Sequence, residues 1–291
     1  RVCSKSGGNS PYGLCDMAGN VWEWVSDAWV ESPTGIDSKG AMQGPVEYEK
    51  RVCRGGSWTR AAADVRITFR DFNWAKTAGC GVGFRCAMDG GPDVSDADGA
   101  AKPKAKADPD WATIPAGCFQ MGAPYGESER DDDETRHEVC LSRPFLMHKT
   151  EVTQGQWQSL MGTNPSGFSS CGSTCPVENV TWFEALSYCN ELSRQKGLDT
   201  CYSLTGCKGA VGNGMKCTGA SFTGLTCNGC RLPTEAEWEY ANRAGATTAF
   251  STGDCLGADQ AAYNGAKPQP GCPSRGPNRA SPIKTASFDA N

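Results

Sequence analysis

The stretch RLPTEAEWEYANRAG at residues 231–245 carries the clearest local structural signal in this sequence. Thr234 is followed three positions later by Glu237, which is the spacing of a helix-starting capping box. Trp238 and Ala241 then fall on the same side of the predicted helix, and a glycine at the end of the stretch is a typical helix stop. The stretch therefore predicts a short helix with a buried inner face.

Two further helices begin with the same signature. Capping boxes start at Thr153 and Thr181, and Gly162 and Gly197 follow as stops. Between the helices lie apolar segments and long glycine-rich stretches, and the chain holds 36 Gly and 17 Pro. Helices and strands that do not alternate regularly are typical of the α+β class. We expect an α+β fold with much irregular, loop-rich backbone.

The strands are expected on both sides of these helices. The segments 111–122 and 137–148 look like paired strands, and Cys118 would meet Cys140 across them. Upstream, DMAGNVWEWVSDAW at residues 16–29 predicts one short helical or turn segment, followed by short strands.

Composition excludes several classes of protein. The net charge is −5 over 291 residues, with no face rich in lysine or arginine, so nucleic acid is not an expected partner. The apolar runs are too short to cross a bilayer, so no membrane span is expected.

The 17 cysteines predict disulfides and an oxidising compartment, that is, a secreted, periplasmic or cell-surface protein. They stand in close sequence pairs, namely Cys171 with Cys175, Cys201 with Cys207, and Cys217 with Cys227. Zinc is the alternative, but the sequence has two histidines and a lone C-x2-C at residues 227–230. Any export signal would lie upstream of Arg1.

Residues 91–108 divide the chain. They are mostly Gly, Ala, Asp, Lys and Pro, with almost nothing to bury, which indicates a flexible linker. A long surface loop is the alternative. The flanks differ in pattern, so no internal repeat is seen across the linker.

Several motifs together resemble the formylglycine-generating-enzyme, or sulfatase-modifying-factor, family, whose fold is C-type-lectin-like. They cover nearly everything outside the linker, and they are EVTQGQW (151–157), PVENVTWFEALSYCNEL (176–192), RLPTEAEWEYANRAG (231–245), YGLCDMAGNVWEWVSD (12–27), RGGSW (54–58) and GFRCA (83–87). The resemblance implies a bacterial, disulfide-containing, loop-rich domain. It also implies a disulfide between Cys86 and Cys189.

The order of these motifs is reversed with respect to the family. We therefore interpret residues 1–90 as the C-terminal part of one domain and 109–291 as the N-terminal part of a second, tandem copy. A circular permutation is the alternative. In either case the two parts are expected to dock into one fold, because neither alone can bury its aromatic face.

The resemblance implies a calcium site in the turn at residues 16–23. Carried over by position, its ligands are the Asp16 side chain, the Gly19 and Val21 carbonyls, and Glu23. Calcium accepts such a mixed set of oxygen ligands. The alternative is a turn packed by tryptophans without an ion. A second family site would use Asn264 and Gly265, but its later aspartate has no clear counterpart here.

The enzymes of this family hold copper with a Cys-x4-Cys pair after the GGS corner, because two thiolates make a soft Cu(I) site. Arg60 and Val65 stand there in this sequence, and no cysteine lies between Arg54 and Gly79. We expect no copper and no cysteine oxidation in this copy. An iron site, as in the related sulfoxide synthases, needs several histidines, whereas only His137 and His148 are present.

The segment after the corner also resembles the variable face of C-type-lectin-like display proteins. On that comparison a ligand surface would comprise Trp58, Thr59, Arg60 and Asp64. Arg66 and Arg70 would support it from beneath. The alternative places Trp58 in the core and Arg60 at a solvated edge.

Two other catalytic interpretations are weaker. Ser57 has no histidine near it in sequence. Glu235 and Glu239 share a helix face, where capping and solvation are the usual roles. We therefore expect a non-catalytic secreted binding or accessory module. An oxidoreductase acting through a copy whose active-site segment lies outside this chain, and a purely structural extracellular module, are the alternatives.

Overall fold

The computed structural model describes residues 8–31, 50–79, 81–90, 108–257 and 260–272. We call its described residues up to Gly90 the N-terminal segment and those from Asp108 onward the C-terminal segment. The predicted linker at 91–108 lies outside the described residues apart from Asp108. None of the helices in the described ranges has the length and apolar character needed to span a bilayer.

The N-terminal segment forms a four-stranded sheet in the order β3-β2-β1-β4. Its strands are β1 (Trp22–Ala28), β2 (Lys50–Arg54), β3 (Arg70–Trp74) and β4 (Val82–Gly83). The short 3-10 helix η2 (Ala62–Val65) connects β2 to β3. The stretch at residues 16–29 is thus a turn followed by a strand from Trp22, and its helical alternative is wrong.

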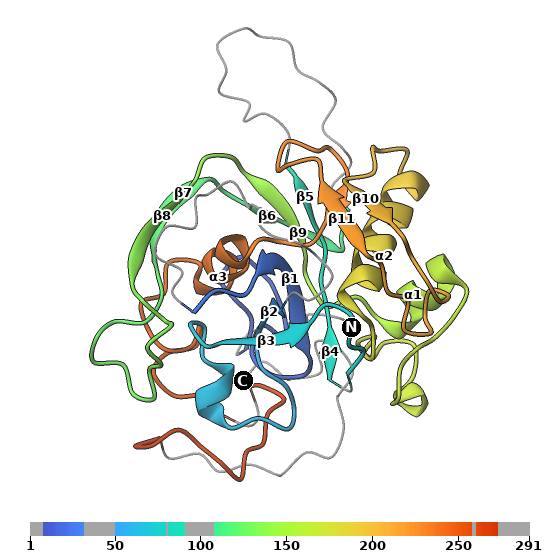
Figure 1. Cartoon of the computed structure of the whole chain (residues 1–291). Helices are drawn as coiled ribbons and strands as arrows, with labels where there is room; N and C mark the ends of the chain where they lie inside the picture. Colours follow the sequence, from blue (N-terminus) through green and yellow to red (C-terminus); the bar gives the residue numbers. More distant parts are fainter. Residues whose placement is uncertain (1–7, 32–49, 80, 91–107, 258–259, 273–291) are drawn as a thin grey trace, which may run out of the picture.

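A second sheet joins the two segments. Its order is β12-β5-β9-β6, with β5 (Ala87–Asp89) from the N-terminal segment between β12 (Cys230–Arg231) and β9 (Phe145–His148), and with β6 (Trp111–Ile114) at the edge. Both neighbours of β5 pair with it antiparallel. Because one strand of this ladder comes from the other segment, the two segments form one packed body (Figure 1).

Two hairpins lie outside these sheets. β7 (Gly117–Met121) pairs with β8 (His137–Leu141), as predicted, and Cys118 bonds Cys140 across them. The second pairs β10 (Tyr202–Thr205) with β11 (Gly219–Phe222).

All three helices begin at the predicted threonines. α1 (Gln154–Met161), α2 (Trp182–Gln195) and α3 (Glu235–Arg243) each have a complete capping box, and a short 3-10 helix, η3 (Ser169–Cys171), follows α1. α3 packs against β1, β2 and β7, so it touches both segments (Figure 1). The helices place their tryptophans inside, and Trp157, Trp182 and Trp238 are fully buried.

Tryptophans also tie the two segments together through their indole N–H groups. Trp24 of β1 donates to the Val180 carbonyl at 3.1 Å, and Trp182 of α2 donates to the Val25 carbonyl at 2.9 Å. A buried indole N–H without a partner is unfavourable, so these reciprocal bonds favour one relative position of β1 and α2.

Buried arginine–carboxylate pairs form the strongest link between the segments. Arg70 of β3 binds both carboxylate oxygens of Glu235 at 2.6 and 3.0 Å, and Arg54 of β2 binds Glu239 at 2.6 Å. Arg66 similarly binds Glu134 at 2.6 and 2.8 Å. Arg66 and Arg70 are thus buried partners of carboxylates in the C-terminal segment.

The disulfides confirm the prediction that cysteines are bonded to one another. Two of the pairs, however, differ from those that the sequence spacing indicated. Cys171 bonds Cys175, as their spacing indicated. In the β10–β11 hairpin, however, Cys207 bonds Cys217 and Cys201 bonds Cys227. The hairpin brings cysteines that flank its two strands opposite one another, so the Cys201–Cys227 disulfide encloses the Cys207–Cys217 disulfide in the sequence. A further disulfide, Cys255–Cys272, closes a loop after α3.

Replacing Arg70 by methionine should strongly destabilise the fold. The change leaves the Glu235 carboxylate buried without its main partner, which costs about 3–5 kcal/mol for a buried pair. The matched control is Arg194→Met, because Arg194 pairs with Glu191 on the surface, where the cost is about 1 kcal/mol or less. Urea unfolding measures both, and equal losses would show that the Arg70 pair is not a main link.

The contribution of His148 to the stability of the fold should fall as pH decreases from about 6.5. His148 is buried against the Trp111 ring, and burial together with the charges of Lys196 and Arg85 lowers its pKa from 6.5 to about 3. Between these values the unfolded chain binds a proton that the folded chain does not, so protonation favours unfolding, by at most about 1.4 kcal/mol per pH unit. Urea unfolding of His148→Gln should show a shallower decline between pH 6.5 and 4.5. An unchanged slope would contradict this assignment.

Candidate functional site

The GGS corner follows β2, at the place where the family's enzymes carry their copper pair. Gly55 and Gly56 have positive φ values of 86° and 72°. A Cβ at Gly56 would lie 2.4 Å from Cγ1 of Val65, so close packing of η2 requires glycine there. The corner is thus explained by the approach of η2 to β2.

Both residues that the resemblance places at the copper positions have structural partners. Val65 is 1% exposed and packs in a small apolar cluster with Phe250 and Tyr263. The Arg60 side chain is 43% exposed and forms an ion pair with Asp71 at 3.2 Å. The nearest thiol in sequence, Cys53, is buried in β2, and burial together with the charge of Asp71 raises its pKa.

The predicted ligand surface is only partly assembled. Thr59 is exposed and Arg60 partly exposed, but Trp58 is 3% exposed, so its prediction as a surface contact is wrong. Its ring meets Phe168 edge-to-face at 5.2 Å, because the loop after α1 covers it. Sequence reasoning missed Phe168, since the two residues are far apart in the chain.

The remaining residues near the corner have structural partners. The Asp64 carboxylate accepts a bond from the Ala61 N–H at 3.3 Å, within η2. The Ser57 hydroxyl lies 3.0 Å from that of Thr59. These bonds hold the turn and leave Ser57 without a base of the kind that a nucleophile needs.

The two glutamates of α3 are buried rather than solvated, which corrects the expected surface role. Glu235 and Glu239 are each 1% exposed. Arg70 and Arg54 hold the pKa of Glu235 below its usual range against the effect of burial. Glu239 additionally accepts bonds from the Gly122 N–H and from Arg243. Carboxylates fixed in this way hold the segments together.

The turn at residues 16–23 has the backbone that a ligand loop requires. Asp16 and Asn20 adopt positive φ values of 57° and 61°. A Cβ at Gly19 would lie 2.1 Å from the Ala262 carbonyl oxygen, so only glycine fits there. Asp16 is buried at the start of this turn, and the Glu23 side chain is buried at its end.

The Glu23 carboxylate is largely engaged. Its Oε2 accepts bonds from Arg85 at 2.7 Å and from Trp238 at 3.0 Å, and its Oε1 accepts from Arg85 at 2.7 Å. A carboxylate offers about four lone-pair positions. Oε1 therefore retains room for one more interaction, such as a monodentate bond to a cation.

A third carboxylate lies next to this turn. Glu151 is completely buried, its Oε1 accepts a bond from the Asn20 amide at 3.0 Å, and its Oε2 has no hydrogen-bond partner among the described residues. Burial, followed by the charge of Asp16, raises the pKa of Glu151 well above its usual range. The raised pKa favours the protonated form of Glu151 unless a cation lies beside it. The ligand oxygens of these three carboxylates do not all lie within 4.8 Å of one another, so a cation held by all three would require side-chain movement.

The second family calcium position has little support. The side-chain carbonyl of Asn264 accepts a bond from the Ala266 N–H at 3.2 Å. The backbone N–H of Asn264 donates to the Arg60 carbonyl at 2.8 Å. Asn264 and Gly265 thus shape a turn beside Arg60.

The two histidines lie on different strands. His137 begins β8, with Nδ1 2.9 Å from the Thr135 carbonyl, whereas His148 is buried in β9. Among the described residues, the one group of three metal-ligand side chains is Cys118, Glu138 and Cys140, and its two sulfurs form a disulfide.

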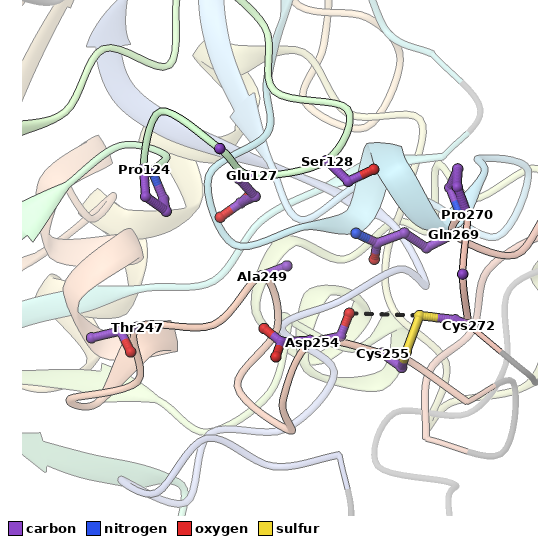
Figure 2. A pocket seen from close by; sticks show the side chains of 12 residues that line it. Pro124, Glu127, Ser128, Thr247, Ala249, Asp254, Cys255, Gln269, Pro270 and Cys272 are labelled. Atoms are coloured by element: carbon purple, nitrogen blue, oxygen red, sulfur yellow. Dashed lines mark hydrogen bonds between the residues drawn. A yellow bond between two sulfur atoms is a disulfide. The ribbon is translucent and has the colours of Figure 1, made fainter.

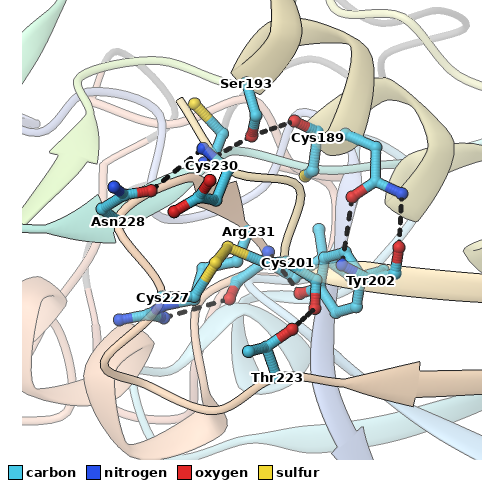
Figure 3. The surroundings of a disulfide bond; sticks show 12 residues. Cys189, Ser193, Cys201, Tyr202, Thr223, Cys227, Asn228, Cys230 and Arg231 are labelled. Atoms are coloured by element: carbon cyan, nitrogen blue, oxygen red, sulfur yellow. Dashed lines mark hydrogen bonds between the residues drawn. A yellow bond between two sulfur atoms is a disulfide. The ribbon is translucent and has the colours of Figure 1, made fainter. Parts of the chain in front are cut away.

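Cys86 and Cys189 are brought together but not bonded. Their sulfur atoms are 3.8 Å apart in the core, and Cys230 is nearby. Figure 3 shows Cys189 and Cys230 on either side of Ser193, whose hydroxyl donates to the Cys189 carbonyl and accepts from the Cys230 N–H, each at 2.8 Å. Burial raises the pKa of Cys86 and raises that of Cys230 to about 12. The Cys86–Cys189 disulfide stays a prediction.

Comparison with known proteins agrees with these motifs. The family model described as "Sulfatase-modifying factor enzyme 1-like domain" matches residues 2–90 and 97–287. The chain belongs to this sulfatase-modifying-factor family.

The relatives of this chain include a protein named as a chaperone and one named as a formylglycine-generating enzyme. The chain is 43% identical over 110 residues to the "Chaperone protein LppX" of Paenibacillus barcinonensis, which covers 37% of this chain and 38% of the relative. It is 39% identical over 88 residues to the formylglycine-generating enzyme of Thermomonospora curvata, covering 27% and 28%. The chain thus spans well under half the length of these relatives. Among solved structures, Treponema denticola variable protein 1 aligns over 48% of this chain and 54% of its own, at 29% identity and a TM-score of 0.37.

Proposed function

We propose that this sulfatase-modifying-factor family chain is a non-catalytic binding or accessory module. The observation that carries the proposal is the pair Arg60 and Val65 at the copper positions. A guanidinium and a buried isopropyl group offer no soft ligand for Cu(I). The name of the relative from Paenibacillus barcinonensis supports an accessory role, since that protein is named a chaperone.

The compartment is part of the same proposal. Five disulfides join residues in the C-terminal segment, and such a density is typical of oxidising environments. We therefore propose a secreted, periplasmic or cell-surface bacterial protein. The reversed order of the motifs supports a tandem arrangement of domains. The enzymatic alternative requires a Cys-x4-Cys pair in a copy beyond Asn291, and sequencing that region would identify it.

The last part of the proposal concerns a calcium site. We propose that calcium binds the turn at 16–23 through Asp16, the Gly19 and Val21 carbonyls and Oε1 of Glu23. The unpartnered Oε2 of the buried Glu151, next to this turn, supports a dication there. Bound calcium would offset the negative charge of these carboxylates and hold the turn against Arg85.

Calcium should raise the melting temperature of the protein. A ligand at 100 times its dissociation constant adds about 2.7 kcal/mol, which corresponds to about 5–10 °C for a chain of this size. Asp16→Asn should abolish the shift, because asparagine tolerates the positive φ of 57° but carries no charge. Scanning calorimetry in calcium and in chelator measures this. Asp199→Asn on the surface is the matched control. Identical melting temperatures in both buffers would refute the site.

Titration with Cu(I) should reveal no tight, thiolate-dependent binding to the native protein. The described free thiols, Cys53, Cys86, Cys189 and Cys230, are all buried, and none stands at the copper positions. A competition assay with a chromophoric Cu(I) chelator measures the affinity, with a family enzyme that has the cysteine pair as positive control. Tight binding that is lost after thiol alkylation would contradict the non-catalytic assignment.

A further inference from the structure

A cavity of about 450 Å³ is lined by none of the residues assigned above to the ligand surface or the calcium turn. It is formed between the β7–β8 loop and the loops that follow α3, and the Cys255–Cys272 disulfide closes one side (Figure 2). This volume is within the range of small-molecule sites. No motif in the sequence indicated it, because its walls come from residues about 120 to 150 positions apart.

The charged residues of the cavity wall are all acidic. Glu127 and Asp254 line it from opposite loops, and no Lys, Arg or His is among the lining residues. Glu127 is already paired, since its Oε1 lies 2.7 Å from Arg66. The exposed Asp254 carboxylate has no ion pair or hydrogen bond with other described residues. Asp254 is therefore the charge available to a ligand.

A buried amide group provides an independent sign of a missing partner. Gln269 is 6% exposed, and its Oε1 is buried without a hydrogen-bond partner among the described residues. Such an unsatisfied acceptor costs about 1–3 kcal/mol. Figure 2 shows the Gln269 amide pointing into the cavity, on the side facing Asp254. The side-chain amide of Gln269 is thus placed to accept a bond from an N–H donor.

The surroundings favour a cation with an apolar stem. Residues 127–134, ESERDDDE, carry six carboxylates and one arginine. Arg66 and Arg70 neutralise part of this charge, and Arg130 lies over the Tyr125 ring at 5.5 Å and near Asp132. Six carboxylates thus face three arginines, which leaves an excess of negative charge on this segment beside the cavity. Pro124, Ala249 and Pro270 provide apolar wall between the polar groups.

We propose that this cavity binds a primary ammonium or guanidinium group on a short alkyl chain. Asp254 supplies the ionic contact, the Gln269 amide accepts a second hydrogen bond, and the alkyl stem lies along the apolar wall. The inference rests on the proposed binding role and gives that role a ligand class. The copper titration does not depend on it, so each can fail without the other.

Calorimetric titration of the full chain with cadaverine and with agmatine tests the proposal, and pentanol serves as the neutral analogue. We expect both cations to bind and pentanol not to bind. Asp254→Asn should weaken cation binding about fivefold, which is the upper range for an exposed charge pair. Asp254 is exposed and makes no side-chain contact that the fold needs, so this variant should fold normally.

Asp132→Asn is the matched control, because it removes the same charge from the same acidic surface outside the cavity wall. It should leave cation affinity within about twofold of the unmodified chain. Gln269→Met, which keeps the side-chain length, should weaken binding without changing its salt dependence. Equal losses in Asp132→Asn and Asp254→Asn would reduce the effect to a diffuse surface field and overturn the proposal. Equal binding of pentanol and cadaverine, or no binding of either cation, would also overturn it.

The source of the cation is decided by a second set of probes. The free diamine is compared with Nα-acetyl-lysine amide and Nα-acetyl-arginine amide, which present the same groups as a peptide side chain. Tighter binding of the blocked amino acids indicates a basic segment of a protein partner. Tighter binding of the diamine indicates a free small-molecule amine. In both cases Asp254→Asn must weaken the preferred ligand.

Discussion

The fold depends on buried ion pairs between the arginines of β2 and β3 and the glutamates of α3. Arg54 and Arg70 are almost completely buried, and they reach Glu239 and Glu235 across the junction of the two segments. A buried charge without its partner is costly, so neither segment can retain these residues inside unless the other is in place. The pairs therefore specify how α3 sits against β2, and with it the position of the GGS corner.

The same ion pairs also fix the surroundings of the GGS corner. The arginines below it are fully used in holding α3 and the β7–β8 loop, and η2 closes over Gly56. Arg60, which pairs with Asp71, and the buried Val65 stand where the family resemblance places the copper cysteines. The corner is closely packed and hydrogen-bonded, and such a turn suits a scaffold that presents loops. The Arg66–Glu127 pair also fixes part of the wall of the acidic cavity, because Glu127 lines it.

Predictions from short sequence patterns were confirmed where the structure depends on contacts between residues that are close in the chain. The three capping boxes determine the start of each helix, because the bonds they make lie within four residues. The Cys118–Cys140 pair follows from a simple hairpin. The nested disulfides of the β10–β11 hairpin did not follow from spacing, since a long loop permits several pairings. Trp58 was misplaced because its cover, Phe168, comes from a loop 110 positions away.

The sequence by itself determined the helices, the family motifs and the absence of cysteines from the copper positions, because these depend on residue identity and short spacing. The tertiary structure alone decided that Glu235 and Glu239 are buried ion-pair partners and that Glu151 joins Asp16 and Glu23. It also formed the cavity that unites Glu127, Asp254 and Gln269. These groupings arise from long-range docking, in which burial and charge pairing are settled only when distant strands and loops meet.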